Sequence, residues 1–327
     1  MRIAILGAGA WGTALALTFV RTHDVSLWVW EAGGADALRA ARENRRYLPG
    51  HALPPSLRIE SDFAAAVRDA ELALVVTPVS GLRPTLRLLA QHGTAVPVVW
   101  ACKGLEAESG KFPHQVVDEI LPDAVARAAL SGPSFAEEVA KGLPTAVTLA
   151  SSDLDFARRT VAALNTHRLR LYASDDVVGV EIGGAVKNVL AIASGISDGM
   201  GFGLNARAAL ITRGLAEIAR LGAALGGRQH TFMGLAGMGD LILTCTGDLS
   251  RNRRVGLGLA AGKSLDAILQ ELGQTAEGVG TAREVARLAG ERGIDMPITH
   301  AVKGILFDGL PAKMAVEQLL SRDPKVE

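Results

Sequence analysis

The stretch RIAILGAGAWGTALALTF, residues 2–19, joins an apolar run, a glycine-rich turn and a helical pattern. Residues 2–6 predict a buried strand, and residues 7–12 match G-x-G-x-x-G directly after it. Glu31 ends the next apolar run, about twenty residues further on, as the fingerprint of dinucleotide-binding folds requires. The stretch therefore predicts a strand, turn and helix that hold the pyrophosphate of a dinucleotide at the helix N-terminus.

The three glycines of this turn have separate expected roles. Gly7 allows the tight turn, Gly9 lets the pyrophosphate approach the backbone, and Gly12 lets the helix pack on the strand. A secretory signal peptide would share the apolar character of these residues but leaves the glycine spacing unexplained. No other stretch approaches the roughly 18 continuous apolar residues that span a membrane. We therefore expect a soluble, cytoplasmic protein without membrane insertion.

Glu31 also bears on which dinucleotide binds. A carboxylate at this position accepts hydrogen bonds from the adenosine ribose hydroxyls of NAD and repels the additional phosphate of NADP. Arg45 and Arg46 would offset that repulsion if the following helix and loop folded back, and they are otherwise solvated surface charges.

Composition limits the classes of function. The 327 residues carry 34 basic and 34 acidic side chains, with 49% hydrophobic and 21% charged residues, which predicts two folded domains and no general nucleic-acid binder. Cys102 and Cys245 predict two buried, reduced thiols. No Cys/His spacing matches a zinc site, so we expect no metal.

The pattern of elements changes along the chain. Apolar runs alternate with helical segments in the first half and predict parallel βαβ units, whereas only helices are expected after about residue 173. We predict an α/β fold with an N-terminal Rossmann-type doubly wound sheet in residues 1–178, followed by an all-helical C-terminal domain in residues 179–327. The strands are expected at 2–6, 25–30, 57–59, 72–77, 96–101 and 127–130, with 147–150 and 170–172 as additional antiparallel strands. The helices of the first half are expected at 11–21, 35–46, 62–67, 82–90 and 112–121. Those of the second half are expected at 177–196, 207–221, 252–260, 264–272, 281–292, 298–307 and 311–320.

Polar residues follow several of these strands at the edge where open α/β sheets bind ligands. Lys103 comes directly after the apolar run VPVVWAC, which is unusual for a structural position and natural for an anion contact. The run Ser131-Gly132-Pro133-Ser134 is typical of a turn.

Lys187 lies in a helical stripe of very small residues that includes Gly183, Gly184 and Ala191. Each glycine inside a helix costs about 1 kcal/mol relative to alanine, which indicates close approach of a ligand or of another backbone. A lysine facing such a stripe is partly desolvated, which lowers the pKa of its ammonium and suits acid–base work. Tight helix packing, with the lysine reaching out to solvent, is the alternative.

A second group of polar residues follows further along the helical half. The glycines of residues 234–239 predict a flexible or tightly turned loop that presents Asp240. Ser250 predicts an N-cap for a helix that starts at Arg251, with Asn252 in its first turn. An arginine opposes the helix dipole there, which indicates a bound anion such as a phosphate.

The segments GAGAWG, WACKGLE, SGPSFAEEV, GGAVKNVLA, GMGDLILTC and SRNRR, in this order, resemble the bacterial NAD(P)-dependent glycerol-3-phosphate dehydrogenases over nearly the whole chain. That family reduces dihydroxyacetone phosphate to sn-glycerol 3-phosphate, a precursor of phospholipids. The resemblance implies NAD(H) or NADP(H) as the cofactor and a homodimer. The alternative is a 3-hydroxy-acid dehydrogenase of the related helical-domain families, whose carboxylate substrate would leave Arg251 and Asn252 with the wrong partner.

The resemblance also implies roles for individual residues. Lys187 is the general acid/base at the carbonyl oxygen, and Lys103 lies between cofactor and substrate. The implied substrate contacts are Lys103, Gly132, Ser134, Lys187, Asn188, Asp240, Thr244, Ser250, Arg251 and Asn252. The implied cofactor contacts are Gly7, Gly9, Ala10, Trp11, Gly12, Trp30, Glu31, Lys103, Ala136, Arg251, Thr275 and Glu277.

Two positions depart from the family pattern. Ala10 stands where many members have serine, which removes one hydroxyl contact to phosphate. Trp30 and Glu31 stand where NADP-using members tend to have a basic residue. We therefore predict that NADH is used at least as well as NADPH.

Overall fold

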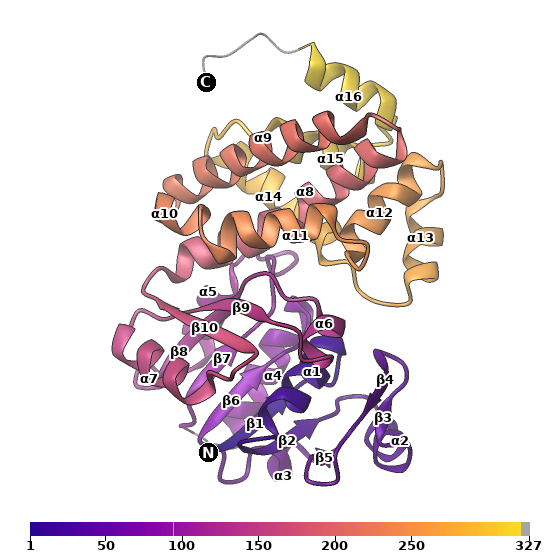
Figure 1. Cartoon of the computed structure of the whole chain (residues 1–327). Helices are drawn as coiled ribbons and strands as arrows, with labels where there is room; N and C mark the ends of the chain where they lie inside the picture. The colour runs from indigo at the N-terminus through magenta and orange to yellow at the C-terminus, as the bar shows by residue number, and fades with distance from the viewer. Residues whose placement is uncertain (94, 322–327) are drawn as a thin grey trace. The chain divides into compact units, whose positions relative to one another are not determined.

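The computed structural model describes residues 1–93 and 95–321, and the chain forms two compact units (Figure 1). The first unit comprises residues 1–103 and 111–180. The second comprises residues 104–110 and the described residues from 181 onward. The short segment 104–110 thus belongs with helices that come much later in the sequence.

An eight-stranded sheet forms the centre of the first unit, in the spatial order β10-β9-β8-β7-β6-β1-β2-β5. The six strands from β8 to β5 are parallel, β9 is antiparallel to β8, and β10 is parallel to β9. The strands are β1 (Arg2–Leu6), β2 (Asp24–Trp28), β5 (Arg58–Glu60), β6 (Leu72–Val75), β7 (Val98–Trp100), β8 (Arg127–Ser131), β9 (Thr145–Ala150) and β10 (Leu169–Ser174). The predicted Rossmann-type sheet is confirmed, and the last two strands do run opposite to the others.

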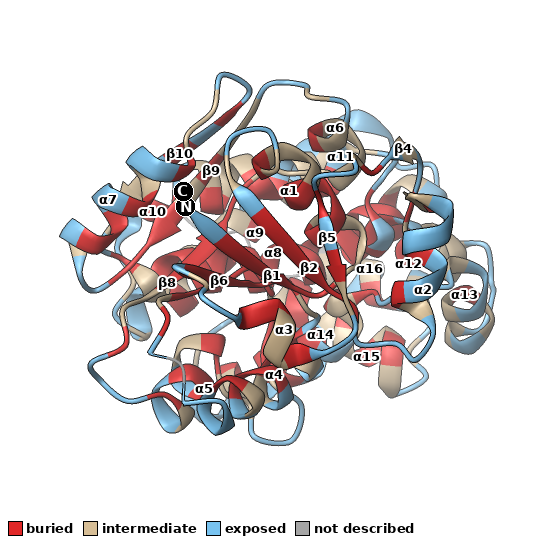
Figure 2. Ribbon diagram, turned by 90° about the horizontal axis from the view of Figure 1, so that it is seen from below, coloured by how far each residue is buried: buried red, intermediate tan, exposed pale blue. Residues whose placement is uncertain are grey.

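Helices cover both faces of this sheet, as a doubly wound fold requires. In Figure 2, α1 and α6 lie on one face and α3, α4 and α5 on the other. The middle of the sheet is buried, with Ile5, Leu74 and Val99 each at most 1% exposed. Runs of apolar residues therefore form these strands because both faces pack against helices. The helices are α1 (Ala10–Phe19), α2 (Gly34–Ala41), α3 (Phe63–Val67), α4 (Val79–Gln91), α5 (Pro113–Ile120), α6 (Ala136–Ala140) and α7 (Leu154–Leu164).

The segment after α2 differs from its sequence prediction. A helix was expected over residues 35–46, but α2 ends at Ala41 because Arg42 adopts a left-handed conformation with φ +47°. The chain then forms an antiparallel hairpin of β3 (Glu43–Asn44) and β4 (Leu48–Ala52). Arg45 and Arg46 therefore lie on a hairpin turn and not on a helix.

The described part of the second unit is helical, as predicted. Its long helix α8 (Val177–Gly199) starts in the first unit and is long and apolar enough to cross a membrane. However, 89% of an 18-residue stretch of this helix is buried, as in the core helix of a soluble protein. The remaining elements are α9 (Gly203–Ala224), α10 (Gln229–Phe232), the π-helical turn η1 (Leu235–Gly239), α11 (Asp240–Thr246), α12 (Arg251–Ala260), α13 (Leu265–Leu272), α14 (Glu277–Glu291), α15 (Pro297–Phe307) and α16 (Ala312–Leu320).

Close backbone packing explains several glycines in the stripe of α8. A Cβ at Gly195 would collide with the carbonyl oxygen of Arg253, and one at Gly256 would collide with that of Ile192. A Cβ at Gly183 would collide with the carbonyl oxygen of Ala236. The small residues therefore let α12 and η1 approach α8 at backbone distance, which is the packing explanation considered from the sequence.

For the glycines of residues 234–239 the sequence predicted a flexible or tightly turned loop, and the structure shows the tightly turned alternative, in helical form. Residues 235–239 form the turn η1, which continues directly into α11 at Asp240. Gly237 makes this possible because its α-carbon packs against the backbone of Phe232, where a side chain would not fit. Asp240 is consequently held at the start of a helix by rigid packing.

Candidate functional site

The glycine turn after β1 has the geometry of a dinucleotide cradle. Gly7 has φ +122°, and a Cβ there would lie 2.7 Å from the carbonyl oxygen of Val76. A Cβ at Gly12 would collide with the carbonyl oxygen of Gly7, so helix and strand pack too closely for any side chain. At Gly9, by contrast, a Cβ would meet nothing within 4 Å. Gly9 is also the N-cap of α1 and has no side-chain cap, so a phosphate can approach the first N–H groups of this helix.

Thr77 adds an unsatisfied hydroxyl beside this cradle. It follows β6, the neighbour of β1, at the place where the strand order reverses. Its methyl group would lie 3.3 Å from a Cβ at Gly7, and its Oγ1 is buried without a hydrogen-bond partner among the described residues. Buried polar atoms without partners are rare, so this hydroxyl fits a site that is completed by a ligand. The residues present therefore fit a bound dinucleotide.

Lys103, Gly132 and Ser134 come together as the sequence predicted. Lys103 Nζ donates to the carbonyl oxygen of Gly132 at 3.1 Å, and Ser134 Oγ donates to the same oxygen at 3.0 Å. Gly132 has φ +140°, and a Cβ there would lie 3.0 Å from the Cα of Val147. This glycine thus exposes one carbonyl to both side chains at the carboxyl edge of β7 and β8.

Lys187 is buried and does not reach out to solvent. Its ammonium lies 2.6 Å from Asp240 Oδ1 and donates to Thr244 Oγ1 at 2.9 Å. Only 9% of the Lys187 side chain and 2% of the Asp240 side chain are exposed. Thr244 Oγ1 in turn donates to the Asp240 carbonyl oxygen at 2.6 Å, so its single hydrogen is committed and its lone pair accepts from the lysine. The carboxylate favours the charged form of Lys187, which opposes the effect of burial.

Helix α11 is fixed against α8 next to this group. Ser194 Oγ on α8 donates to the carbonyl oxygen of Cys245 at 2.8 Å. Burial raises the pKa of the Cys245 thiol to about 12, so it stays protonated at neutral pH. Cys102 and Cys245 are both buried, and the two are not joined in a disulfide, which agrees with the prediction that both thiols are buried.

Asn188 and Asn252 form a second buried group in the same unit. Asn252 Nδ2 donates to Asn188 Oδ1 at 2.9 Å, and Asn252 Oδ1 accepts from the backbone of Gly278 at 3.0 Å. A Cβ at Gly278 would lie 2.6 Å from the carbonyl oxygen of Asn188. The two amides therefore join α8, α12 and the start of α14.

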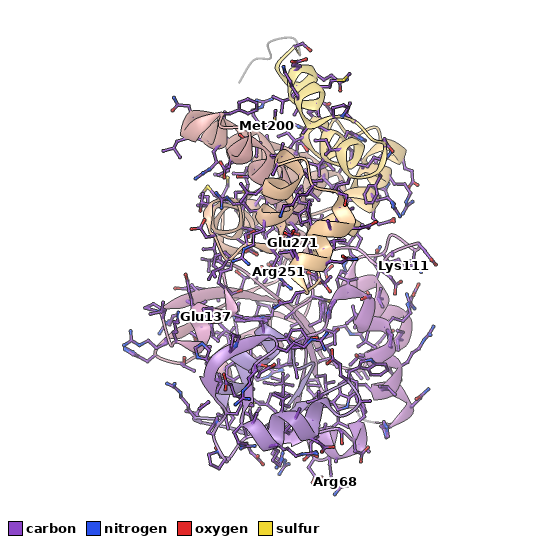
Figure 3. The ribbon with its side chains drawn as sticks, turned by 90° about the vertical axis from the view of Figure 1, so that its right-hand side faces the viewer. Arg68, Lys111, Glu137, Met200, Arg251 and Glu271 are labelled. Carbon is purple, nitrogen blue, oxygen red and sulfur yellow. The ribbon has the colours of Figure 1, made fainter. Side chains whose placement is uncertain are left out.

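The start of α12 agrees with the sequence prediction. Ser250 caps the helix, because its Oγ accepts from the backbone of Arg253 at 3.2 Å. Arg251, labelled in Figure 3, occupies the first helical position, and no acidic residue lies in this turn. Protein atoms around the Arg251 guanidinium displace part of its hydration and lower its pKa, while the Glu277 carboxylate has the opposite effect. A cation at a helix N-terminus is suited to a phosphate.

The remaining predicted contacts lie at element ends or at the surface. Ala136 begins α6, Thr275 is exposed just before α14, and Glu277 begins α14. Trp11 packs partly buried against the core. Trp30 lies two residues beyond the end of β2 and is 69% exposed, with its ring 5.7 Å from that of Trp28. Among the residues that the structure describes, no group of three or more His, Cys, Asp or Glu could hold a metal.

Sequence reasoning missed the residues that hold these groups in place. Asn44 on the hairpin donates to the carbonyl oxygen of Ala8 at 2.9 Å and to Thr13 Oγ1 at 2.7 Å. Asp198 on α8 accepts from Arg253 and Arg207 at 2.8 and 2.7 Å. A buried polar residue leaves no periodic signal, so only an isolated Asn or Asp in an apolar context could have indicated either position.

Comparison with known proteins identifies the family. Residues 2–157 match the family model described as the NAD-dependent glycerol-3-phosphate dehydrogenase N-terminus, and residues 176–317 match its C-terminus. The chain is 63% identical to the glycerol-3-phosphate dehydrogenase [NAD(P)+] of Dechloromonas aromatica over 327 residues, covering all of this chain and 99% of the relative. It is also 63% identical to that of Aromatoleum aromaticum over 328 residues, with both chains fully covered.

A solved structure agrees with these relatives. The glycerol-3-phosphate dehydrogenase of Coxiella burnetii superposes with a TM-score of 0.94 at 44% identity, covering 98% of this chain and 99% of that one.

Proposed function

Because the chain belongs to the NAD-dependent glycerol-3-phosphate dehydrogenase family, we propose that it reduces dihydroxyacetone phosphate to sn-glycerol 3-phosphate with Lys187 as the general acid. The chain is an NAD(P)-dependent oxidoreductase, and each of its two units holds residues suited to one partner of this reaction. The glycine cradle and Glu31 suit the dinucleotide. Lys187, Asn252 and Arg251 suit a phosphorylated ketone.

The buried ion pair of Lys187 with Asp240 is the observation that carries this proposal. A reduced dinucleotide held in the glycine cradle would supply the hydride for the ketone carbon. The ketone oxygen then needs a proton, and the Lys187 ammonium donates it from Nζ. Asp240 keeps this ammonium charged before the step and favours the return of a proton to Nζ after it. Thr244 limits the directions in which the ammonium can point, because it occupies one of the three N–H bonds.

The phosphate of the substrate is expected at the start of α12. The first backbone N–H groups of this helix and the Arg251 side chain both favour an anion. The buried amide of Asn252 is held by Asn188 and by the Gly278 backbone, so it stays in one orientation. A phosphate held there positions the ketone for reduction, which lowers the entropic part of the barrier.

The first test compares the wild type with Lys187→Ala, using dihydroxyacetone phosphate with NADH and with NADPH. We expect turnover in the wild type and a fall in kcat of roughly a hundredfold or more in the variant, in the range that general acid catalysis contributes. Lys263→Ala is the matched control, because Lys263 is an exposed lysine of the same unit that pairs with Glu271. It should keep turnover within about twofold of wild type, as expected for an isolated surface pair.

A folding check accompanies this test, since removing Lys187 leaves Asp240 buried without its cation. The variant should still bind NADH, and its circular dichroism should match that of the wild type. Turnover of a folded Lys187→Ala variant near the wild-type rate would overturn the role of Lys187. No wild-type turnover with either cofactor would overturn the substrate, and 3-hydroxy acids would then be screened.

We also propose a cytoplasmic location, a homodimer and a role in supplying the backbone of glycerophospholipids. These features follow from the family resemblance. Gel filtration with light scattering tests the dimer, and a chain that elutes as a monomer at micromolar concentration would contradict it.

A further inference from the structure

The hairpin of β3 and β4 brings two polar side chains to the residue that faces the adenosine ribose in Rossmann-type folds. Glu31 lies three residues beyond the end of β2, where such folds place the acidic residue that binds the ribose 2′-hydroxyl. Its Oε2 lies 2.7 Å from Arg46 Nη1, and its Oε1 accepts from the Tyr47 hydroxyl at 2.7 Å. The Glu31 carboxylate is therefore held by the Arg46 and Tyr47 side chains of the hairpin turn.

A buried amide fixes the position of this hairpin. Asn44 is 4% exposed and uses both Nδ2 hydrogens, one on the carbonyl oxygen of Ala8 and one on Thr13 Oγ1. Its Oδ1 accepts from the Tyr47 backbone at 3.2 Å. Leu48, the next strand residue, packs in a small apolar cluster beside α1. The turn with Arg46 and Tyr47 is thus attached to the glycine cradle itself and cannot move far from it.

The Glu31–Arg46 pair does little for stability. The two side chains are 45% and 64% exposed, and exposed ion pairs contribute only about 0–1 kcal/mol to folding. The Arg46 guanidinium also lies 4.9 Å from the centre of the Tyr47 ring, so it can keep that contact while it changes its anionic partner. An exposed arginine held beside an acidic residue is free to exchange one anion for another.

We propose that Arg46 is the residue that lets this enzyme accept NADP(H) as well as NAD(H). With NAD(H), Arg46 stays on Glu31 and the carboxylate accepts from the ribose hydroxyl. With NADP(H), the guanidinium turns to the 2′-phosphate and offsets the repulsion between that phosphate and Glu31. Arginine suits this exchange because its planar fork binds carboxylate and phosphate alike. The inference rests on the proposed dinucleotide site and adds the residue that sets its selectivity.

Binding measurements on the full chain without substrate test this inference separately from turnover. Titration calorimetry gives the Kd of NADPH and of NADH, and adenosine 2′,5′-bisphosphate and AMP repeat the comparison without the nicotinamide. We expect Arg46→Ala to raise the Kd of NADPH and of the bisphosphate by about 10- to 100-fold, because a charge-assisted contact to phosphate is lost. NADH and AMP should change by no more than about twofold, since Arg46 does not contact them.

Two further variants sharpen the result. Arg45→Ala is the matched control, because Arg45 lies on the same turn but pairs with Glu43 at 3.2 Å, and it should leave all four affinities nearly unchanged. Glu31→Gln should lower the Kd of NADPH at least about threefold, because a like charge near the 2′-phosphate is removed. The same change should raise the Kd of NADH.

The outcomes separate this inference from the proposed function. Equal effects of Arg46→Ala on NADPH and NADH, or no effect on either, would overturn the role of Arg46 and leave the dehydrogenase assignment in place. A wild-type chain that binds neither dinucleotide would overturn both.

Discussion

Two ion pairs of nearly equal length lie in very different surroundings in this molecule. Lys187 and Asp240 are 2.6 Å apart with 9% and 2% of their side chains exposed. Arg46 and Glu31 are 2.7 Å apart with 64% and 45% exposed. The buried pair is enclosed by protein and contacts Thr244, whereas about half of the surface of the exposed pair is open to solvent. Distance alone therefore does not tell what an ion pair does, because solvent decides how much the charges depend on each other.

The difference suits the two proposed tasks. A proton donor must stay in one place and keep its charge, which the buried pair ensures. A group that accepts two cofactors must change partners at small cost, which the exposed pair allows. Three predictions follow from this contrast. They concern the carboxylates of Asp240, Glu217 and Glu31.

The largest effect is expected for the buried pair. Asp240→Ala leaves the Lys187 ammonium buried without its carboxylate, and we expect a loss of about 3–5 kcal/mol in the free energy of unfolding. The double variant Lys187→Met/Asp240→Leu removes both charges and should regain most of that stability while remaining inactive. Urea unfolding measures the free energy of unfolding of both variants. A double variant no more stable than Asp240→Ala would contradict the claim that the unpaired, buried Lys187 ammonium causes the loss.

An intermediate effect is expected for Glu217, a carboxylate that is 1% exposed and accepts hydrogen bonds from two backbone N–H groups and one hydroxyl. It accepts from the backbone of Ile298 at 2.6 Å and from the backbone and hydroxyl of Thr299 at 3.1 and 2.8 Å. Burial raises its pKa, and these hydrogen bonds and Arg220 only partly oppose that shift. A comparison of Glu217 with Asp240 therefore shows how much a paired lysine changes the stability of a buried carboxylate.

The raised pKa means that the folded chain binds this proton more tightly than the unfolded chain does. The contribution to stability is therefore full below the ordinary pKa of 4.5 and is lost as the pH rises through the higher folded pKa. Glu217→Gln should remove this decline and cost about 1–3 kcal/mol at low pH, because an NH2 group, which only donates, replaces one of the two accepting oxygens. Urea unfolding at several pH values checks this, and a difference between the two proteins that does not change with pH would contradict the sign.

The smallest effect is expected for the exposed pair. A double-mutant cycle of Glu31→Gln and Arg46→Ala should give a coupling of about 0–1 kcal/mol in the free energy of unfolding, and less at high salt. Any larger value would make the pair a structural element and weaken the argument that Arg46 is free to exchange anions.

The sequence predicted the structure correctly where interactions between neighbouring residues determine it. The alternation of β1, the glycine turn and α1 is set by residues next to one another, and the position of Ser250 at the start of α12 follows from its own hydroxyl. The hairpin was missed because its position depends on Asn44, whose partners at Ala8 and Thr13 lie more than thirty residues away. The turn before Asp240 was predicted as a flexible or tightly turned loop, and its helical form was missed because Gly237 packs directly against the backbone of Phe232, a contact that the sequence pattern does not show.

The sequence by itself determined the dinucleotide fold, the helical second half and the residue types of the Lys187–Asp240 and Glu31–Arg46 pairs. Those features follow from apolar periodicity, glycine spacing and capping, which act over a few residues. Only the tertiary structure decided that Lys187 is buried on Asp240 and Thr244 and that Arg46 holds Glu31 at the surface. The paired residues are 53 and 15 positions apart in the chain, and the free energy of each contact depends on how much water the surrounding fold excludes.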